Sequence, residues 1–280
     1  MRHYQLARRL SHADVDFLGE LKVPALLGLL EQAAVEASAD AGFDAAWYTR
    51  EGRIWIIRRT RLQRVVPVGG CETVEVDTHI ADFRRARSLR RYSIRRDGIE
   101  TAHATTDWVY CDMASGRPVR IPEPMQQAFM SGDAAPTLPR ADAVSSAGTG
   151  APVEHAVTVQ PSHLDHVTHV NNAVYASYLE DGAFHLFATR AWPLGRMLAA
   201  GGALRMQRLD IEYLSDALLG DVLTVRSWLY DEWALAAAGV PAPARLLQTI
   251  ARADGKDIVR AASDWAWRHK PAVVGGVPAA

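Results

Sequence analysis

The sequence predicts an α+β protein built from two similar halves, each with one long helix packed on one face of an antiparallel sheet. Three observations carry this prediction. One half of the sequence can be aligned with the other, a segment without periodicity separates them, and each half has a helix-like run followed by alternating strand-like runs. The expected architecture is therefore a duplicated unit within one chain.

The repeat is clearest at the start of the expected helices. Residues 16–31 align without a gap with residues 165–180, at an offset of 149. The same offset places the strand that begins at Glu72 on the strand that begins at Asp221, each shortly after a glycine. Matching Asp-Trp pairs near the end of each half follow at an offset of 157, because the loops differ in length.

The segment 131–152 is rich in Pro, Ala, Gly and Ser and shows no periodicity, which is typical of an exposed linker. The sequence therefore predicts a first domain over residues 1–130, a linker, and a second domain over residues 153–280.

Within each half a helix precedes the strands. Pro24 suits the first turn of a helix that ends near Gly42, and its counterpart is expected to begin at Asn171 or Asn172 and to run to about Ala188. Alternating apolar residues predict strands. The expected strands are residues 74–80, 90–96, 105–112, 223–229 and 262–268.

The composition is that of an ordinary soluble protein. The 280 residues include 31 basic and 32 acidic side chains, which disfavours nucleic acid as a partner. Two cysteines exclude a disulfide framework and a four-cysteine zinc site. The sequence has no signal peptide and no apolar run long enough to span a membrane. We therefore expect a cytoplasmic protein with no metal, no cofactor and no membrane partner.

One sequence motif, between residues 165 and 175, is distinctive. Asp165 is followed at fixed spacing by His169, Asn171, Asn172 and Tyr175. This string, inside a duplicated helix-and-meander pattern, resembles the hotdog-fold thioesterases, and the whole chain is most similar to the double-hotdog acyl-ACP thioesterases, as a bacterial member. The resemblance implies tandem hotdog domains that form a pseudo-dimer within one chain. It also implies an acyl thioester substrate carried by acyl carrier protein (ACP) or coenzyme A, with Tyr175 at the substrate. Homo-oligomers are left open.

Thioester hydrolysis needs a base or nucleophile, and a donor for the developing oxyanion. The unpaired amides of a helix N-terminus can supply that donor. By resemblance, Asp165 activates water or attacks the thioester directly, the backbone amide of Asn172 polarises the carbonyl, and His169 and Asp216 are also catalytic. The family's Asn two residues after the Asp is Val167 here.

Each of these residues also has a structural interpretation. An Asp before a helix is often a turn residue, an Asn there is often a cap, and a single His is often on the surface. Their combination within the repeat favours the functional interpretation.

The first half lacks most of the string. It keeps Asp16 but has Glu20, Lys22 and Val23 at the positions of the His and the two Asn residues, with Pro24 directly after. Glu20 is expected to repel an anion, and Pro24 removes a helix-start amide. We therefore expect one active site, in the second half, with the first half supplying the opposing wall and the acyl tunnel.

Residues 84–96 contain seven arginines. In a strand, Arg85, Arg87 and Arg91 share one face. They could bind the phosphates of the carrier or steer an acidic carrier protein, or they could form a solvated edge that discourages aggregation.

Two other functions remain open. A hydratase or dehydratase of the same fold would also act on acyl thioesters, and a binding module would keep the tunnel without turnover. Release of free thiol distinguishes hydrolysis from both.

Overall fold

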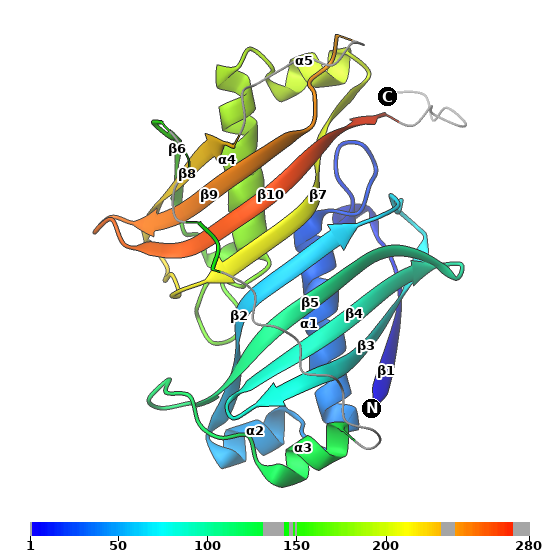
Figure 1. The fold of residues 1–280 in the computed structure, drawn as a ribbon, viewed down its shortest axis with the longest axis vertical. Coiled ribbons are helices and arrows are strands. Elements are labelled where there is room, and N and C mark those ends of the chain that lie inside the picture. Colours follow the sequence, from blue (N-terminus) through cyan, green and yellow to red (C-terminus); the bar gives the residue numbers. More distant parts are fainter. Residues whose placement is uncertain (1, 131–142, 146–147, 149, 231–238, 271–280) are drawn as a thin grey trace.

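The computed structural model describes residues 2–130, 143–145, 148, 150–230 and 239–270. Within these residues ten strands form one antiparallel sheet, and two long helices lie on the same face of it (Figure 1). The strand order is β1-β3-β4-β5-β2-β7-β10-β9-β8-β6. The second half of this order mirrors the first, so the two halves have the same internal topology.

The first half contains strands β1 (His3–Arg9), β2 (Arg53–Arg64), β3 (Thr73–Arg84), β4 (Arg87–Arg96) and β5 (Ile99–Asp112), with helices α1 (Val23–Asp40), α2 (Ala45–Glu51) and α3 (Glu123–Phe129). The second half contains strands β6 (Val153–Thr158), β7 (Gly202–Tyr213), β8 (Val222–Leu229), β9 (Ala244–Arg252) and β10 (Asp257–His269), with helices α4 (Val174–Thr189) and α5 (Leu194–Ala199).

Strands β2 and β7 join the halves into one sheet. Arg61 pairs directly with Asp210, and these two residues are 149 positions apart, so an approximate two-fold axis passes between them. Next to them the Arg59 guanidinium contacts both carboxylate oxygens of Asp210 at 2.7 Å in a buried ion pair. The two halves therefore share one sheet.

The core lies between the sheet and the two long helices. Leu26 and Leu30 of α1 and Leu179 and Leu186 of α4 are each at most 2% exposed. A side chain at Gly182 would meet Val225 of β8 at 2.6 Å, so α4 approaches the sheet more closely than a larger residue would allow. Burial of these apolar faces fixes where each helix begins relative to the strands.

Two local predictions need correction. Helix α4 begins at Val174 rather than at Asn171 or Asn172, because the preceding residues form a capping turn. The arginine-rich run is not one strand. Arg84 pairs with Arg87 across a two-residue turn in which Arg85 has φ 50°, so Arg85 lies in a hairpin turn instead of on the strand face.

Much of the segment proposed as a linker (131–142, 146–147 and 149) lies outside the described residues, so the domain limits stay predictions. In the part of the chain that is described, no helix is long and apolar enough to cross a membrane.

Candidate active site

Asp165 closes the turn that leads into α4. Its Oδ1 accepts hydrogen bonds from the backbone N–H groups of Val167 (3.0 Å) and His169 (3.3 Å). Among the described residues, its other oxygen, Oδ2, takes part in no hydrogen bond or ion pair. Asp165 is therefore a turn residue, as the structural interpretation expects, and it also keeps one carboxylate oxygen available for chemistry.

The same turn holds a strained residue. Thr168 has φ 66°, a conformation that a β-branched residue rarely adopts, and the matching residue of the first half is Gly19 at φ 79°. Strain of this kind costs of order 1–3 kcal/mol and persists where surrounding contacts fix the backbone. Here it lies between Asp165 and His169, in the segment that sets their relative positions.

His169 and Asp216, each expected at the site, lie next to each other. The His169 Nε2 lies 3.3 Å from Asp216 Oδ2, and both side chains are about half exposed. Ser215 donates to Asp216 Oδ1 at 3.1 Å, and Arg252 lies 3.5 Å from the same oxygen. Asp216 can thus orient the His169 ring, and Arg252 offsets the charge of Asp216. Val167, at the position of the family's Asn, exposes its side chain.

The two asparagines have different roles. Asn171 closes a turn just before α4, since its Oδ1 accepts from the Ala173 N–H at 2.8 Å. The carbonyl of Asn172 accepts from the Tyr213 hydroxyl at 3.1 Å. Within the described residues, the N–H of Asn172 donates to no backbone or side-chain acceptor. That amide is free to bind a carbonyl oxygen.

A pocket opens beside this amide and runs into the first half. The pocket is narrow, with a volume of about 10 Å³. Its wall comes from α1, from β2, β4 and β5, and from the segment that precedes α4, and comprises Leu27, Leu30, Glu31, Ile57, Thr60, Tyr92, Thr106, Trp108, Asn172, Ala173 and Tyr213. Most of this wall belongs to the first half, where the acyl tunnel was expected. Tyr175, expected at the substrate, is 2% exposed and packs against the ring of Tyr213.

Glu31 is a site residue that the sequence prediction missed. It lies on α1 of the first half, yet its carboxyl has the Asn171 side chain as a hydrogen-bonding neighbour and lies close enough to Asp165 and His166 to interact with their charges. Burial raises the pKa of Glu31, the Asn171 hydrogen bond lowers it, and the charge of Asp165 raises it. No motif around Glu31 indicates that it crosses to the other half.

In the first half, charged side chains that pair with one another occupy the corresponding place. Asp16 forms the same turn, with Oδ1 accepting from Leu18 at 2.7 Å. Its Oδ2 lies 2.6 Å from the guanidinium of Arg205, which is also 3.4 Å from Glu180. All three side chains are buried or nearly so.

The structure changes the reason for expecting this half to be inactive. Glu20 does not face the turn as a free charge, because it pairs with Arg64 at 3.1 Å. Instead Arg205 neutralises Asp16 and occupies the space beside it.

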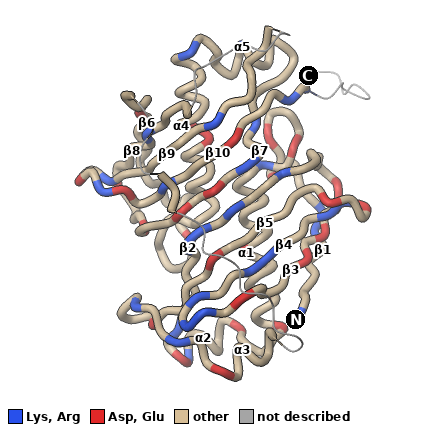
Figure 2. The backbone as a smooth tube through the Cα atoms, in the orientation of Figure 1, with Lys and Arg blue, Asp and Glu red and all other residues tan. Residues whose placement is uncertain are grey.

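The arginine face is confirmed in part. Arg87 and Arg91 lie on the outward face of β4, where Arg87 is 3.5 Å from Asp107. Arg90 points the other way, into the interior, with its guanidinium 5.6 Å from the Phe129 ring. Figure 2 shows basic positions on β2 as well as on β4.

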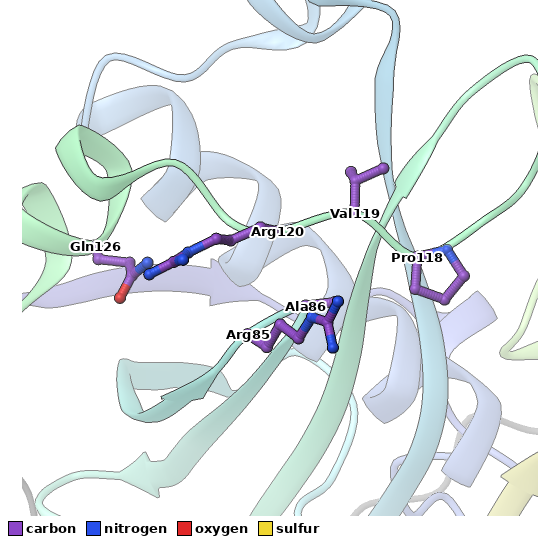
Figure 3. Close-up of a pocket in the computed structure, with 6 residues that line it drawn as sticks. All are labelled: Arg85, Ala86, Pro118, Val119, Arg120 and Gln126. Carbon is purple, nitrogen blue, oxygen red and sulfur yellow. The ribbon is translucent and has the colours of Figure 1, made fainter.

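Arg85 contributes to a separate hollow of about 700 Å³. Its wall is formed by the β3–β4 turn, the segment after β5 and α3. Figure 3 shows Arg120 extending toward Gln126, with Arg85 coming from the turn. The hollow lies at the end of the first half and shares no residue with the pocket beside Asn172.

One group in the described residues has the composition of a metal site. His3, Asp77 and His79 lie on the neighbouring strands β1 and β3, and His3 is already hydrogen-bonded to Asp77 at 2.9 Å. Strands β4 and β5 separate this group from β2, so it is not part of the site around Asp165.

The comparisons with known proteins agree with this geometry. Residues 2–129 match the acyl-ACP thioesterase N-terminal domain, and residues 159–261 match the thioesterase-like superfamily. No curated protein sequence matches the chain.

Similar solved structures cover nearly the whole chain. They include a protein described as an oleoyl thioesterase from Lactobacillus plantarum, with TM-score 0.78, 19% identity, and 97% of this chain and 98% of that chain covered. An acyl-ACP thioesterase from Bacteroides thetaiotaomicron has TM-score 0.74 and 17% identity, with 94% and 97% covered. The 12:0-ACP thioesterase from Umbellularia californica has TM-score 0.69 and 15% identity, with 96% and 98% covered.

At these identities the structures establish the fold, and the family matches extend over both halves. The chain belongs to the acyl-ACP thioesterases and is a thioester hydrolase of the hotdog fold.

Proposed function

We propose that the chain hydrolyses acyl-ACP thioesters at a single site, formed by the turn before α4 and the pocket that enters the first half. One observation carries the proposal. An uncommitted oxygen of Asp165 and the free N–H of Asn172 occur at the start of one helix, beside a pocket whose inner wall is largely apolar. A base, an oxyanion donor and a shielded acyl site are the three requirements of the reaction.

In this mechanism the Asn172 N–H binds the thioester carbonyl oxygen and stabilises the negative charge that develops on it. Asp165 takes a proton from a water molecule as the water oxygen attacks the carbonyl carbon. The C–S bond then breaks, its electron pair leaves with sulfur, and the proton passes to the thiolate. Direct attack by Asp165, followed by hydrolysis of the anhydride, needs the same free oxygen and remains open.

We also propose that the two halves form a pseudo-dimer with one active site. The shared sheet and the matching topology support this arrangement. The contrast between the free Asp165 oxygen and the Arg205-bound Asp16 supports the asymmetry.

The test of function is steady-state release of free thiol from a panel of acyl-ACP and acyl-CoA thioesters, followed with a thiol reagent. Thiol release with a preference for ACP supports the proposal. Hydration of an enoyl thioester without thiol release would instead indicate a hydratase. Binding of acyl thioesters without any turnover would indicate a binding module. Either of the last two results contradicts hydrolysis.

The arginine face leads to a prediction about the carrier. Replacing Arg85, Arg87 and Arg91 with Ala should raise KM for acyl-ACP more than it lowers kcat, and the effect should shrink as salt is added. Steering and uniform binding act on capture of the substrate rather than on the chemical step. Steady-state kinetics at low and high ionic strength measure both parameters.

A control removes the same charge elsewhere, at Arg190, Arg196 and Arg226 on the surface of the second half. This control should leave KM close to the wild-type value. If both triple variants raised KM equally, net charge would be responsible and not the first-half arginines. An unchanged KM at low salt in the first variant would favour the solvated-edge interpretation.

A further inference from the structure

Each long helix places one carboxyl group near the turn of the opposite half. Glu31 of α1 and Glu180 of α4 occupy equivalent positions of the repeat, 149 residues apart. Glu180 meets the first-half turn through Arg205, which bridges it to Asp16. Glu31 meets the second-half turn beside Asn171 and Asp165. Each of the two sites therefore combines an Asp from its own turn with a Glu from the long helix of the opposite half.

The sites differ in the cation between these acids. In the first half Arg205 lies 2.6 Å from Asp16 and 3.4 Å from Glu180. The repeat places Ile56 at the position of Arg205, and their sheet partners keep this correspondence, since Arg205 pairs with Ala266 and Ile56 pairs with Val109. In the described residues no Lys or Arg forms an ion pair with Asp165 or Glu31.

Two carboxyl groups that share a partly buried site without a cation cannot both carry charge cheaply, so one of them retains its proton. Glu31 is the better candidate. It lines the pocket wall, and burial there raises its pKa.

The groups around Glu31 change its pKa in opposite directions. Its pKa is raised by burial and by the charge of Asp165, and it is lowered by the Asn171 hydrogen bond and by His166. Burial raises the pKa of the hydroxyls of Tyr92 and Tyr213, which line the same pocket, and the charge of an ionised Glu31 also raises it.

We propose that Glu31 is a positioning residue for the second-half site, a carboxyl that holds the Asn171 side chain and, while protonated, adds no second negative charge beside Asp165. This inference rests on the proposed hydrolysis. Its consequence is a loss of activity on the alkaline side. When Glu31 ionises, a second negative charge appears beside Asp165 and opposes the oxyanion that forms at Asn172.

The test compares Glu31→Gln with Glu31→Leu over a range of pH. Gln reproduces the shape and hydrogen bonds of a neutral carboxyl, so its kcat should not fall on the alkaline side as that of the wild type does. Leu cannot hold Asn171, and its kcat should be lower than that of the Gln variant at every pH, by roughly tenfold for one lost hydrogen bond.

A second readout does not depend on activity. Folding raises the pKa of Glu31, so its contribution to stability is fully present below the pKa of the unfolded chain and is lost as pH rises through the folded-state pKa. Gln does not titrate. The melting temperature of Glu31→Gln minus that of the wild type should therefore increase with pH through this window.

The matched control is Glu180→Gln. Glu180 lies beside Arg205, so this variant should lower thermal stability while leaving the shape of the pH–rate profile unchanged. If Glu31→Gln were as inactive as Glu31→Leu, or kept the alkaline fall in kcat, the proposal would be overturned. A melting-temperature difference that stays flat with pH would also overturn it. Absence of thiol release by the wild type would refute the hydrolysis itself and leave the stability test in place.

Discussion

Replacing Asp165 with Asn is expected to slow thiol release by roughly two to four orders of magnitude, the range for loss of a general base. Asn keeps an oxygen that can accept the hydrogen bonds from Val167 and His169, so the turn before α4 should persist. What is lost is the free, charged oxygen. The measurement is kcat for the variant, with circular dichroism and the melting temperature to show that the fold is intact.

The matched variant is Asp16→Asn in the other half. Asp16 forms the same turn but faces Arg205 at 2.6 Å, so no substrate carbonyl can approach its free side. Activity per folded molecule should fall far less than in Asp165→Asn, although the melting temperature should drop because Arg205 loses a partner. Equal losses of activity in the two variants, both folded, would require the single-site description to be abandoned.

The second large effect is expected on stability. Arg205 is 1% exposed and bridges Asp16 and Glu180, so Arg205→Met leaves two buried carboxyl groups without a cation. Breaking a buried ion pair in this way costs about 3–5 kcal/mol of unfolding free energy. Urea unfolding measures the change.

The control for this stability change is Arg208→Met, three positions along the same strand. Arg208 is half exposed and lies 3.7 Å from Asp264, and exposed pairs contribute about 0–1 kcal/mol. Adding Asp16→Asn and Glu180→Gln to Arg205→Met should recover much of the loss, because the uncompensated charges are then removed. Similar costs for the two single variants, or no recovery in the triple variant, would show that Arg205 does not hold this network together.

The repeat, the two long helices and five of the strands could be predicted because their patterns are local. Strands β2 and β7 were harder to predict, since both carry charged residues that a half-buried strand usually lacks. The structure gives the reason: the two strands pair with each other, and Arg59 is neutralised by Asp210 of the other half. A partner 151 residues away leaves no periodic signal.

In the site, as in the fold, local features could be predicted and contacts between distant residues could not. The turn at Asp165 was expected from a compact string, and His169 and Asp216 were each expected at the site, although their approach to one another was not predicted. Glu31 was not expected, because it reaches the site only through the packing of α1 against the opposite half. The position of Arg85 was also mistaken, since the arginines on both sides of it suggested a continuous strand while Arg84 and Arg87 close a turn.

The central claim is that one chain carries one working site, at the start of α4. Isothermal titration with a non-hydrolysable acyl thioether analogue of the acyl-pantetheine group tests it directly. We expect one analogue molecule to bind per chain. Binding of two molecules per chain would show that the first-half turn is also open despite Arg205, and would contradict the account.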